Sequence, residues 1–213
     1  MQELLKVNCV VAVEQKGRLS KFPVVLTANQ GDTVYIQSTR QRCDALFEGL
    51  CGLHKPEQGQ IWVQNTDIYA LPPEDAATFR RDKIGGIPYG GGLIPELRMI
   101  DQIALPLKLA GVESDNIIAE IRKMTNHLLP FHSLFNPPAR VTERKKAHAA
   151  LIRALITKPS LVIMNGFLDG YDEVDADALW QVFRELRPDD STLLYFSSDP
   201  TPEQIVWTKK LRI

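Results

Sequence analysis

The run SLVIMNG, at residues 160–166, is the segment that decides the fold. It is apolar without interruption from Leu161 to Met164, as expected of a parallel strand that is covered on both faces. A helical pattern follows, and then a second apolar run, STLLYFSS (191–198). The residues of the helix that should face inward are Leu179, Val182, Phe183 and Leu186. Strand, helix and strand in this order predict an α/β fold with a parallel sheet.

The rest of the chain separates into a strand-rich beginning and a helical middle. Strands are expected around 5–13, 23–27, 33–37 and 60–63, with turns at Gly31-Asp32 and at KPEQGQ (55–60). Helices are expected at 73–82, 99–110, 115–129 and 142–157. The segment IGGIPYGGGLIP (84–95) is glycine-rich and aperiodic, so we expect a loop. In the third helix, one face should hold Ile117, Ile118, Ile121, Met124 and Leu128.

Bulk properties exclude several classes of protein. The 213 residues, with 44% apolar and 24% charged content, fit one globular domain, with or without an inserted subdomain. A net charge of −1 argues against a nucleic-acid partner. Cys9, Cys43 and Cys51 have no metal-ligand spacing and should stay reduced. The first residues do not read as a signal peptide, and no apolar run approaches the ~20 residues of a membrane span, so we expect a cytosolic chain.

Ligands of parallel α/β sheets lie beyond the carboxyl ends of the strands. One of these ends leads into STRQRCDALFEGLCGL (38–53), where a strand-like run, 34–36, is followed by Leu46, Phe47, Leu50 and Leu53 at helical spacing. Strand, short turn and helix is the setting of a phosphate-binding loop. This turn, however, contains arginines, a glutamine and an aspartate where such a loop has glycines.

Three segments resemble the ATP-binding cassette (ABC) ATPases, in the order and spacing of that family. They are ALFEGLCGLHKPEQGQIWVQNTDIYAL (45–71), LIPELRMIDQIALPLKLAG (93–111) and AHAALIRALITKPSLVIM (147–164). The second is most similar to the lipoprotein-release and macrolide-exporter type. The resemblance implies a P-loop NTPase-like fold with a mostly parallel core, an antiparallel β portion and an inserted helical subdomain. It places the core at 1–84 and 157–213, and the subdomain at about 85–156.

The family's phosphate-loop motif departs in this chain at every chemical position. The lysine falls on Cys43, the metal-binding hydroxyl on Asp44, and the glycines on Gln37, Arg40 and Arg42. Side chains at those places obstruct the backbone conformations that glycine supplies. A thiol cannot neutralise a triphosphate, and a carboxylate repels one.

The other motifs of the family depart as well. The Mg²⁺-binding aspartate and the catalytic glutamate fall on Asn165 and Gly166. The glutamine of the loop before the helical subdomain falls on Tyr89, and the switch histidine falls on Ser198. The signature falls on residues 141–145, with Glu143 and Arg144 in place of its glycines. We therefore expect no catalytic residue, no metal and no bound cofactor.

Two interpretations of the altered loop remain open. In the first, Ser38, Thr39 or Asp44 caps the first amides of the helix, and Arg40 or Arg42 pairs with the carboxylate of Asp44. In the second, the loop is an exposed polar turn in which nothing replaces a ligand. We read Arg144-Lys145-Lys146 as a solvated helix face. We read Trp62, Trp180 and Trp207 as packing residues, and His54, His127, His132 and His148 as noncatalytic.

The resemblance implies a non-hydrolysing cytosolic subunit or scaffold of a membrane permease complex. The implied partners are an integral-membrane permease of lipoprotein-release or macrolide-exporter type, and a second ATPase subunit, the same or related. In the family, the coupling helix of the permease lies beside residues that match 89–105. One alternative is a functional ATP-binding subunit, which would use ATP and Mg²⁺. The other is an anion or ligand sensor with contacts from Ser38, Thr39, Arg40 and Arg42.

Overall fold

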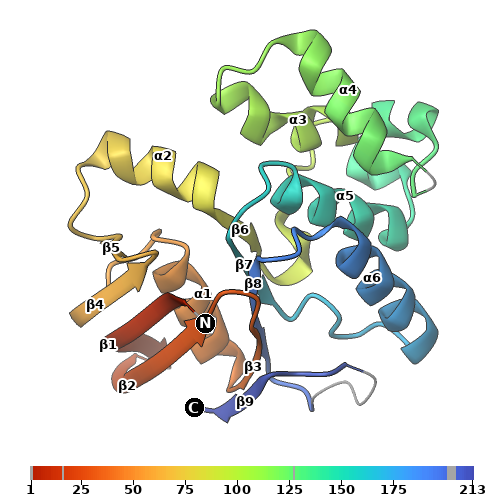
Figure 1. Ribbon diagram of the computed structural model, residues 1–213. Helices are drawn as coiled ribbons and strands as arrows, with labels where there is room; N and C mark the ends of the chain where they lie inside the picture. The colour runs from red at the N-terminus through yellow and green to blue at the C-terminus, as the bar shows by residue number, and fades with distance from the viewer. Residues whose placement is uncertain (1, 16, 127, 201–204) are drawn as a thin grey trace.

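The computed structural model describes residues 2–15, 17–126, 128–200 and 205–213, which form two sheets and a group of helices (Figure 1). The antiparallel sheet has the order β2-β1-β4-β5, and the parallel sheet has the order β6-β7-β8-β3-β9. The strands of the first are β1 (Glu3–Gln15), β2 (Arg18–Asn29), β4 (Gln58–Val63) and β5 (Thr66–Asp67). Those of the second are β3 (Thr33–Gln37), β6 (Ile84–Ile87), β7 (Leu161–Asn165), β8 (Thr192–Ser197) and β9 (Lys209–Arg212).

The parallel sheet separates two hydrophobic layers, because successive side chains of a strand point to opposite faces. Leu161 and Ile163 of β7 pack into a cluster with helix α1 (Arg40–Leu50) and the antiparallel sheet. Val162 and Met164 face helices α5 (Glu143–Leu155) and α6 (Glu173–Leu186). All five residues of β7 and all six of β8 are buried, which explains their continuous apolar runs.

A third hydrophobic cluster joins α5 to helices α3 (Met99–Leu109) and α4 (Ser114–Thr125), which lie at the top of Figure 1. Helix α2 (Pro73–Lys83) connects the antiparallel sheet to β6. The described residues also form 3₁₀ turns at Tyr89–Gly92, Phe131–Phe135 and Pro138–Arg140. Within the described residues, no helix combines the length and the apolar character needed to cross a membrane.

The structure confirms the predicted fold class, a parallel α/β core with an antiparallel portion. The expected loop at 84–95 is wrong at its beginning, since Ile84–Ile87 is a strand parallel to β7. Gly85 is required there, because a β-carbon would lie 2.3 Å from the carbonyl oxygen of Ala154. Strand β9 was not predicted. The boundaries of the helical subdomain stay a prediction.

Two side-chain placements differ from the helical patterns. Ile118 of α4 is 36% exposed, whereas Ile117 and Ile121 are buried. Leu53 is 65% exposed, because α1 ends at Leu50 and the chain turns away from the core. The predictions for Leu179, Val182 and Phe183 hold, since all three are buried in α6. His127 lies outside the described residues.

Candidate functional site

The carboxyl ends of three neighbouring strands bring the expected site residues to one edge of the parallel sheet. Gln37 at the end of β3 pairs with Ser197 of β8, and Asn165 at the end of β7 pairs with Phe196. The turn after β3 is short, because α1 already begins at Arg40. Residues that are far apart in the sequence therefore meet where parallel sheets carry their ligands.

The predicted capping of α1 by a side chain is wrong. Thr39 is the N-cap residue, but its side chain makes no capping hydrogen bond. The Ser38 hydroxyl donates instead to the carbonyl oxygen of Ile213, at 2.6 Å. Asp44 cannot cap the helix, because α1 begins four residues before it and its carboxylate lies on the side of the helix. The helix therefore starts earlier than a cap at Asp44 would require.

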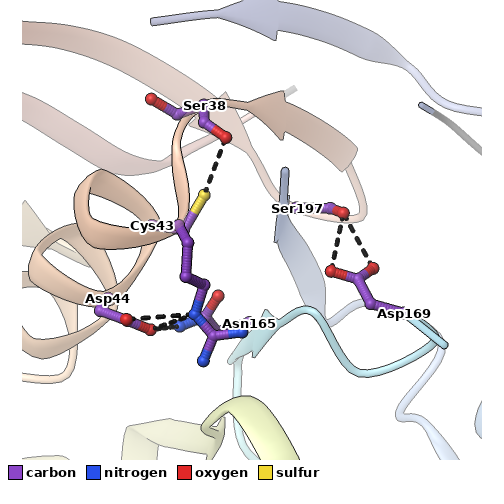
Figure 2. Close-up of polar contacts among 7 residues, drawn as sticks. Ser38, Cys43, Asp44, Asn165, Asp169 and Ser197 are labelled. Atoms are coloured by element: carbon purple, nitrogen blue, oxygen red, sulfur yellow. Dashed lines mark hydrogen bonds and ion pairs between the residues drawn. The ribbon is translucent and has the colours of Figure 1, made fainter. Parts of the chain in front are cut away.

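The predicted ion pair is present, and it includes a third residue (Figure 2). Arg40 Nε donates to the two carboxylate oxygens of Asp44 at 2.9 and 3.1 Å. The amide of Asn165 donates to Asp44 Oδ1 at 2.7 Å. Asn165 is only 2% exposed, so this bond satisfies a buried donor. Asp44 and Asn165, which match the two Mg²⁺-binding positions of the ABC family, are thus bonded to each other.

Both arginines of the altered loop lie on aromatic rings. Arg40 Cζ is 3.1 Å from the ring centroid of Tyr89, and Arg42 Cζ is 4.6 Å from that of Phe22. Such stacking is favourable, because the face of an aromatic ring is electron-rich. Arg40 therefore contacts Asp44 and Tyr89, which both match positions of the family's motifs.

Cys43 occupies the place of the family's lysine and carries no charge there. The side chain is fully buried, and its sulfur lies 3.7 Å from the carbonyl oxygen of Ser38. Burial, with a further contribution from the nearby Asp44, raises the pKa of the Cys43 thiol to about 11. The group is therefore neutral at physiological pH.

Gly166 and Asp169 form the other side of the site. Gly166 has a φ of +58°, which favours glycine. A β-carbon there would lie 2.6 Å from Tyr89 Cδ2 and 2.7 Å from Asp169 Oδ2. Asp169, which the sequence did not single out, accepts from the Ser197 hydroxyl with both oxygens, at 2.8 and 2.9 Å (Figure 2). Ser198, by contrast, is exposed.

The segment that matches the signature is the start of α5. Thr142 caps this helix through a bond from the amide of Lys145. Glu143 pairs with Lys146 at 2.6 Å, and Arg144 lies 3.8 Å from Asp175. Arg144 is 53% exposed, in line with a solvated helix face.

His148 is buried in α5, and burial lowers its pKa. Trp180 and Trp207 pack against each other with a centroid separation of 5.6 Å.

The 3₁₀ turn Tyr89–Gly92 separates the site from an apolar groove. Arg153 holds this turn by donating to the carbonyl oxygens of Gly91 and Gly92, at 2.8 and 2.7 Å. The groove has a volume of about 380 Å³ and is lined by Pro88, α1, β6, α3, the end of α5 and the end of α2, which contributes Arg80 and Arg81. Leu53 and Leu109 on its walls are 65% and 66% exposed. Two large apolar side chains are therefore left in water at one place.

Comparison with known proteins finds similar sequences and similar folds. No protein-family model matches the chain. The lipoprotein-releasing system ATP-binding protein LolD of Colwellia psychrerythraea is 26% identical over 76% of the chain and 63% of its own length, just under two thirds. The macrolide export ATP-binding/permease protein MacB of Syntrophobacter fumaroxidans is 24% identical over 85% of the chain and 26% of its own length.

The solved structures agree with these sequence relationships. A dimeric structure of the ATP-binding cassette MJ0796, in a post-hydrolysis state bound to ADP and Pi, superposes with a TM-score of 0.81 at 19% identity. The superposition covers 92% of this chain and 88% of that one. Sequence relationship and fold together identify the chain as a homologue of the ATP-binding cassette ATPases.

Proposed function

We propose that the chain is an ABC-type subunit that binds a membrane permease without hydrolysing ATP. The observation that carries this proposal is the mutual pairing of side chains at the positions of the family's catalytic motifs. Arg40, Asp44 and Asn165 form one connected network, and Arg40 also stacks on Tyr89. A working site presents these positions to nucleotide and metal, whereas here they satisfy one another.

The residues at these positions do not fit Mg²⁺ and ATP. Phosphates need backbone amides that glycines expose, together with a cation such as the motif lysine. The chain supplies a neutral buried thiol at Cys43 and a carboxylate at Asp44. Gly166 offers no side chain to polarise a water molecule, and the space above it is taken by Tyr89 and Asp169. Charge neutralisation, metal binding and base catalysis would all need replacement groups.

The apolar groove supports the second half of the proposal, the permease partner. The relatives are named as components of a lipoprotein-releasing system and of a macrolide export protein that includes its own permease. The groove lies beside the segment that matches the family's permease contact, and Leu53 and Leu109 on its walls are free to pack against an incoming helix. We place the chain on the inner face of the cell membrane through this partner, paired with a copy of itself or with a related ATPase subunit.

A functional ATP-binding subunit is the main competing proposal. It is favoured by the relatives, which are all named as ATP-binding proteins. An anion sensor has less support, because Arg40 is engaged by Asp44 and Tyr89, and Arg42 lies over Phe22. A cavity lies beside the site, between the Tyr89–Gly92 turn and the start of α5. Among the described residues that line it, neither arginine is present.

Thermal unfolding of the purified chain distinguishes the three proposals. Samples would contain Mg²⁺ with ATP, inorganic phosphate, sulfate or no addition, and a lipoprotein-releasing ATP-binding protein would serve as the positive control. We expect no change in the melting temperature with any addition, and no phosphate release above background. A rise with Mg²⁺ and ATP alone would favour the ATP-binding subunit. A rise with phosphate or sulfate alone would favour the sensor.

A further inference from the structure

A cavity of about 280 Å³ opens next to the paired network, between the Tyr89–Gly92 turn, the start of α5 and the segment after β7. Four of its lining residues are glycines, so little side-chain volume fills it. The walls contain two tyrosine rings, Tyr89 and Tyr171, and the charged groups are Asp169, Glu143 and Lys146. Aromatic faces and carboxylates in one cavity are the chemistry that recognises a cation.

Asp169 is the carboxylate that this cavity leaves without a counter-ion. Its oxygens accept hydrogen bonds from the hydroxyls of Ser197 and Tyr195, which are neutral groups. No cation forms an ion pair with it within the described ranges. Arg40 is close enough to lower the pKa of Asp169, but burial and Asp199 raise it, and Arg40 is already paired with Asp44.

The other charges of the cavity do not neutralise Asp169. Lys146 is committed to Glu143 at 2.6 Å, so the three charged side chains of the lining sum to one negative charge. An anion entering the cavity would meet this negative field, whereas a monovalent cation would cancel it.

The absence of a side chain at Gly166 makes the combination possible. A β-carbon at this position would contact both the Tyr89 ring and the Asp169 carboxylate, at 2.6 and 2.7 Å. With hydrogen there instead, the ring and the carboxylate approach each other on one wall of the cavity. Glycine in place of the family's catalytic glutamate therefore also allows the Tyr89 ring and the Asp169 carboxylate to lie close together.

We propose that this cavity binds a monovalent organic cation, an alkylammonium or guanidinium group, through the Asp169 carboxylate and the ring of Tyr171, since the ring of Tyr89 already carries the guanidinium of Arg40. The cavity is separate from the groove proposed for permease docking, and cation binding requires no ATP hydrolysis. This proposal can therefore be tested independently of the proposed function. The cationic group can come from a small molecule or from an arginine or lysine of a second copy of the chain. Both sources present the same chemistry to Asp169.

The test is a titration of the full-length chain with n-butylguanidinium, and with n-butylurea as a neutral probe of nearly the same shape. Binding would be followed by ¹H–¹⁵N NMR at the amides of Gly90, Gly91, Gly166 and Gly170. We expect saturable shifts at these amides with the cation and none with the urea. Asp169→Asn should weaken binding by roughly tenfold or more, because the charge-assisted contact is lost. Asp115→Asn, an exposed change on α4, is the matched control and should leave the affinity unchanged.

Sedimentation of the same samples identifies the source. If a second copy supplies the cation, the chain dimerises, n-butylguanidinium dissociates the dimer and Asp169→Asn weakens it. If a small molecule supplies it, the monomer itself binds the probe. A monomer that does not bind n-butylguanidinium, or a wild-type chain that binds cation and urea equally, overturns the proposal even if the Asp169→Asn variant does not fold.

Discussion

The two sides of the Tyr89–Gly92 turn have opposite characters. On the side of the strand ends, polar groups at the family's catalytic positions bond to one another, as Asp44 does to Arg40 and Asn165. On the groove side, Leu53 and Leu109 are apolar and exposed, with no covering element among the described residues. In the first region Arg40, Asp44 and the Asn165 amide group are paired with one another, although Asn165 Oδ1 is buried without a partner, while the second region leaves apolar side chains in contact with water. This difference is the structural support for the proposed permease-binding role.

The largest effect is expected from Gly166→Glu, which restores the residue of the family at one catalytic position. The left-handed backbone strains any side chain, and the β-carbon overlaps Tyr89 and Asp169. Together these should lower the free energy of unfolding by ~2–4 kcal/mol. Urea denaturation measures the loss. We expect no ATP hydrolysis, because phosphate positioning and metal binding remain absent.

Gly170→Glu is the matched control for this comparison. Its φ of +82° is also left-handed, but nothing lies within 4 Å of a β-carbon there. Only the backbone strain of ~1–2 kcal/mol should remain. Equal losses in the two variants would show that the space above Gly166 is not filled by Tyr89 and Asp169. Phosphate release by Gly166→Glu would contradict the proposed loss of catalysis.

The groove is tested by Leu109→Glu, which places a charge on an exposed apolar wall. Burying this carboxylate against a permease helix should weaken the complex by ~10–100-fold, since apolar anchors at the centre of interfaces dominate affinity. Co-purification with the permease from detergent-solubilised membranes provides the measurement. Val174→Glu is the control, because Val174 is 78% exposed and lies outside the groove, at the start of α6. If both variants retain the permease, the groove is not the docking surface.

The sequence predicted the framework well and the contacts of the site poorly, for different physical reasons. Strands β7 and β8 are buried on both faces, so their apolar runs were readable. The apolar pattern of strand β6 was not readable, because Gly85 and Gly86 have no side chains; Gly85 leaves space for α5, and Gly86 lies against Phe47 of α1. Strand β9 was not predicted either, because KKLR is a short edge strand with alternate exposed residues and therefore has no apolar run.

Positions of the site could be found by matching motifs, but their partners could not. Asp44 and Asn165 are 121 residues apart, so only the fold shows that they bond. The start of α1 was misplaced because Leu46, Phe47 and Leu50 mark its buried face and leave its first turn unmarked. Asp169 was missed, although an aspartate shortly after a buried strand, at the carboxyl edge of a parallel sheet, is a signal that could have found it.

Asp44→Ala measures how much the paired network stabilises the fold. The substitution removes the acceptor of Asn165 and the partner of Arg40, so we expect a loss of ~1–2 kcal/mol in the free energy of unfolding. Most of it should come from the buried amide, since the ion pair is partly exposed and contributes little. Asp44→Asn keeps an acceptor for Asn165 and should cost less. Similar losses for both substitutions would assign the effect to the ion pair instead.

The smallest effect is expected from Arg42→Ala, and it separates a stacked arginine from an anion-binding one. Arg42 is half-buried with its guanidinium over Phe22, a contact worth ~0.5–1 kcal/mol at such a site. Thermal unfolding of Arg42→Ala, Phe22→Leu and the double variant gives the coupling between the two side chains, which should account for most of the loss. The same measurements with added sulfate test the other role. A stacked Arg42 gives equal responses to sulfate in wild type and variant, because its guanidinium already has a partner in the chain. Stabilisation by sulfate that disappears in Arg42→Ala would mean that the loop holds an anion, and the side chains of the first region would then not be paired with one another alone.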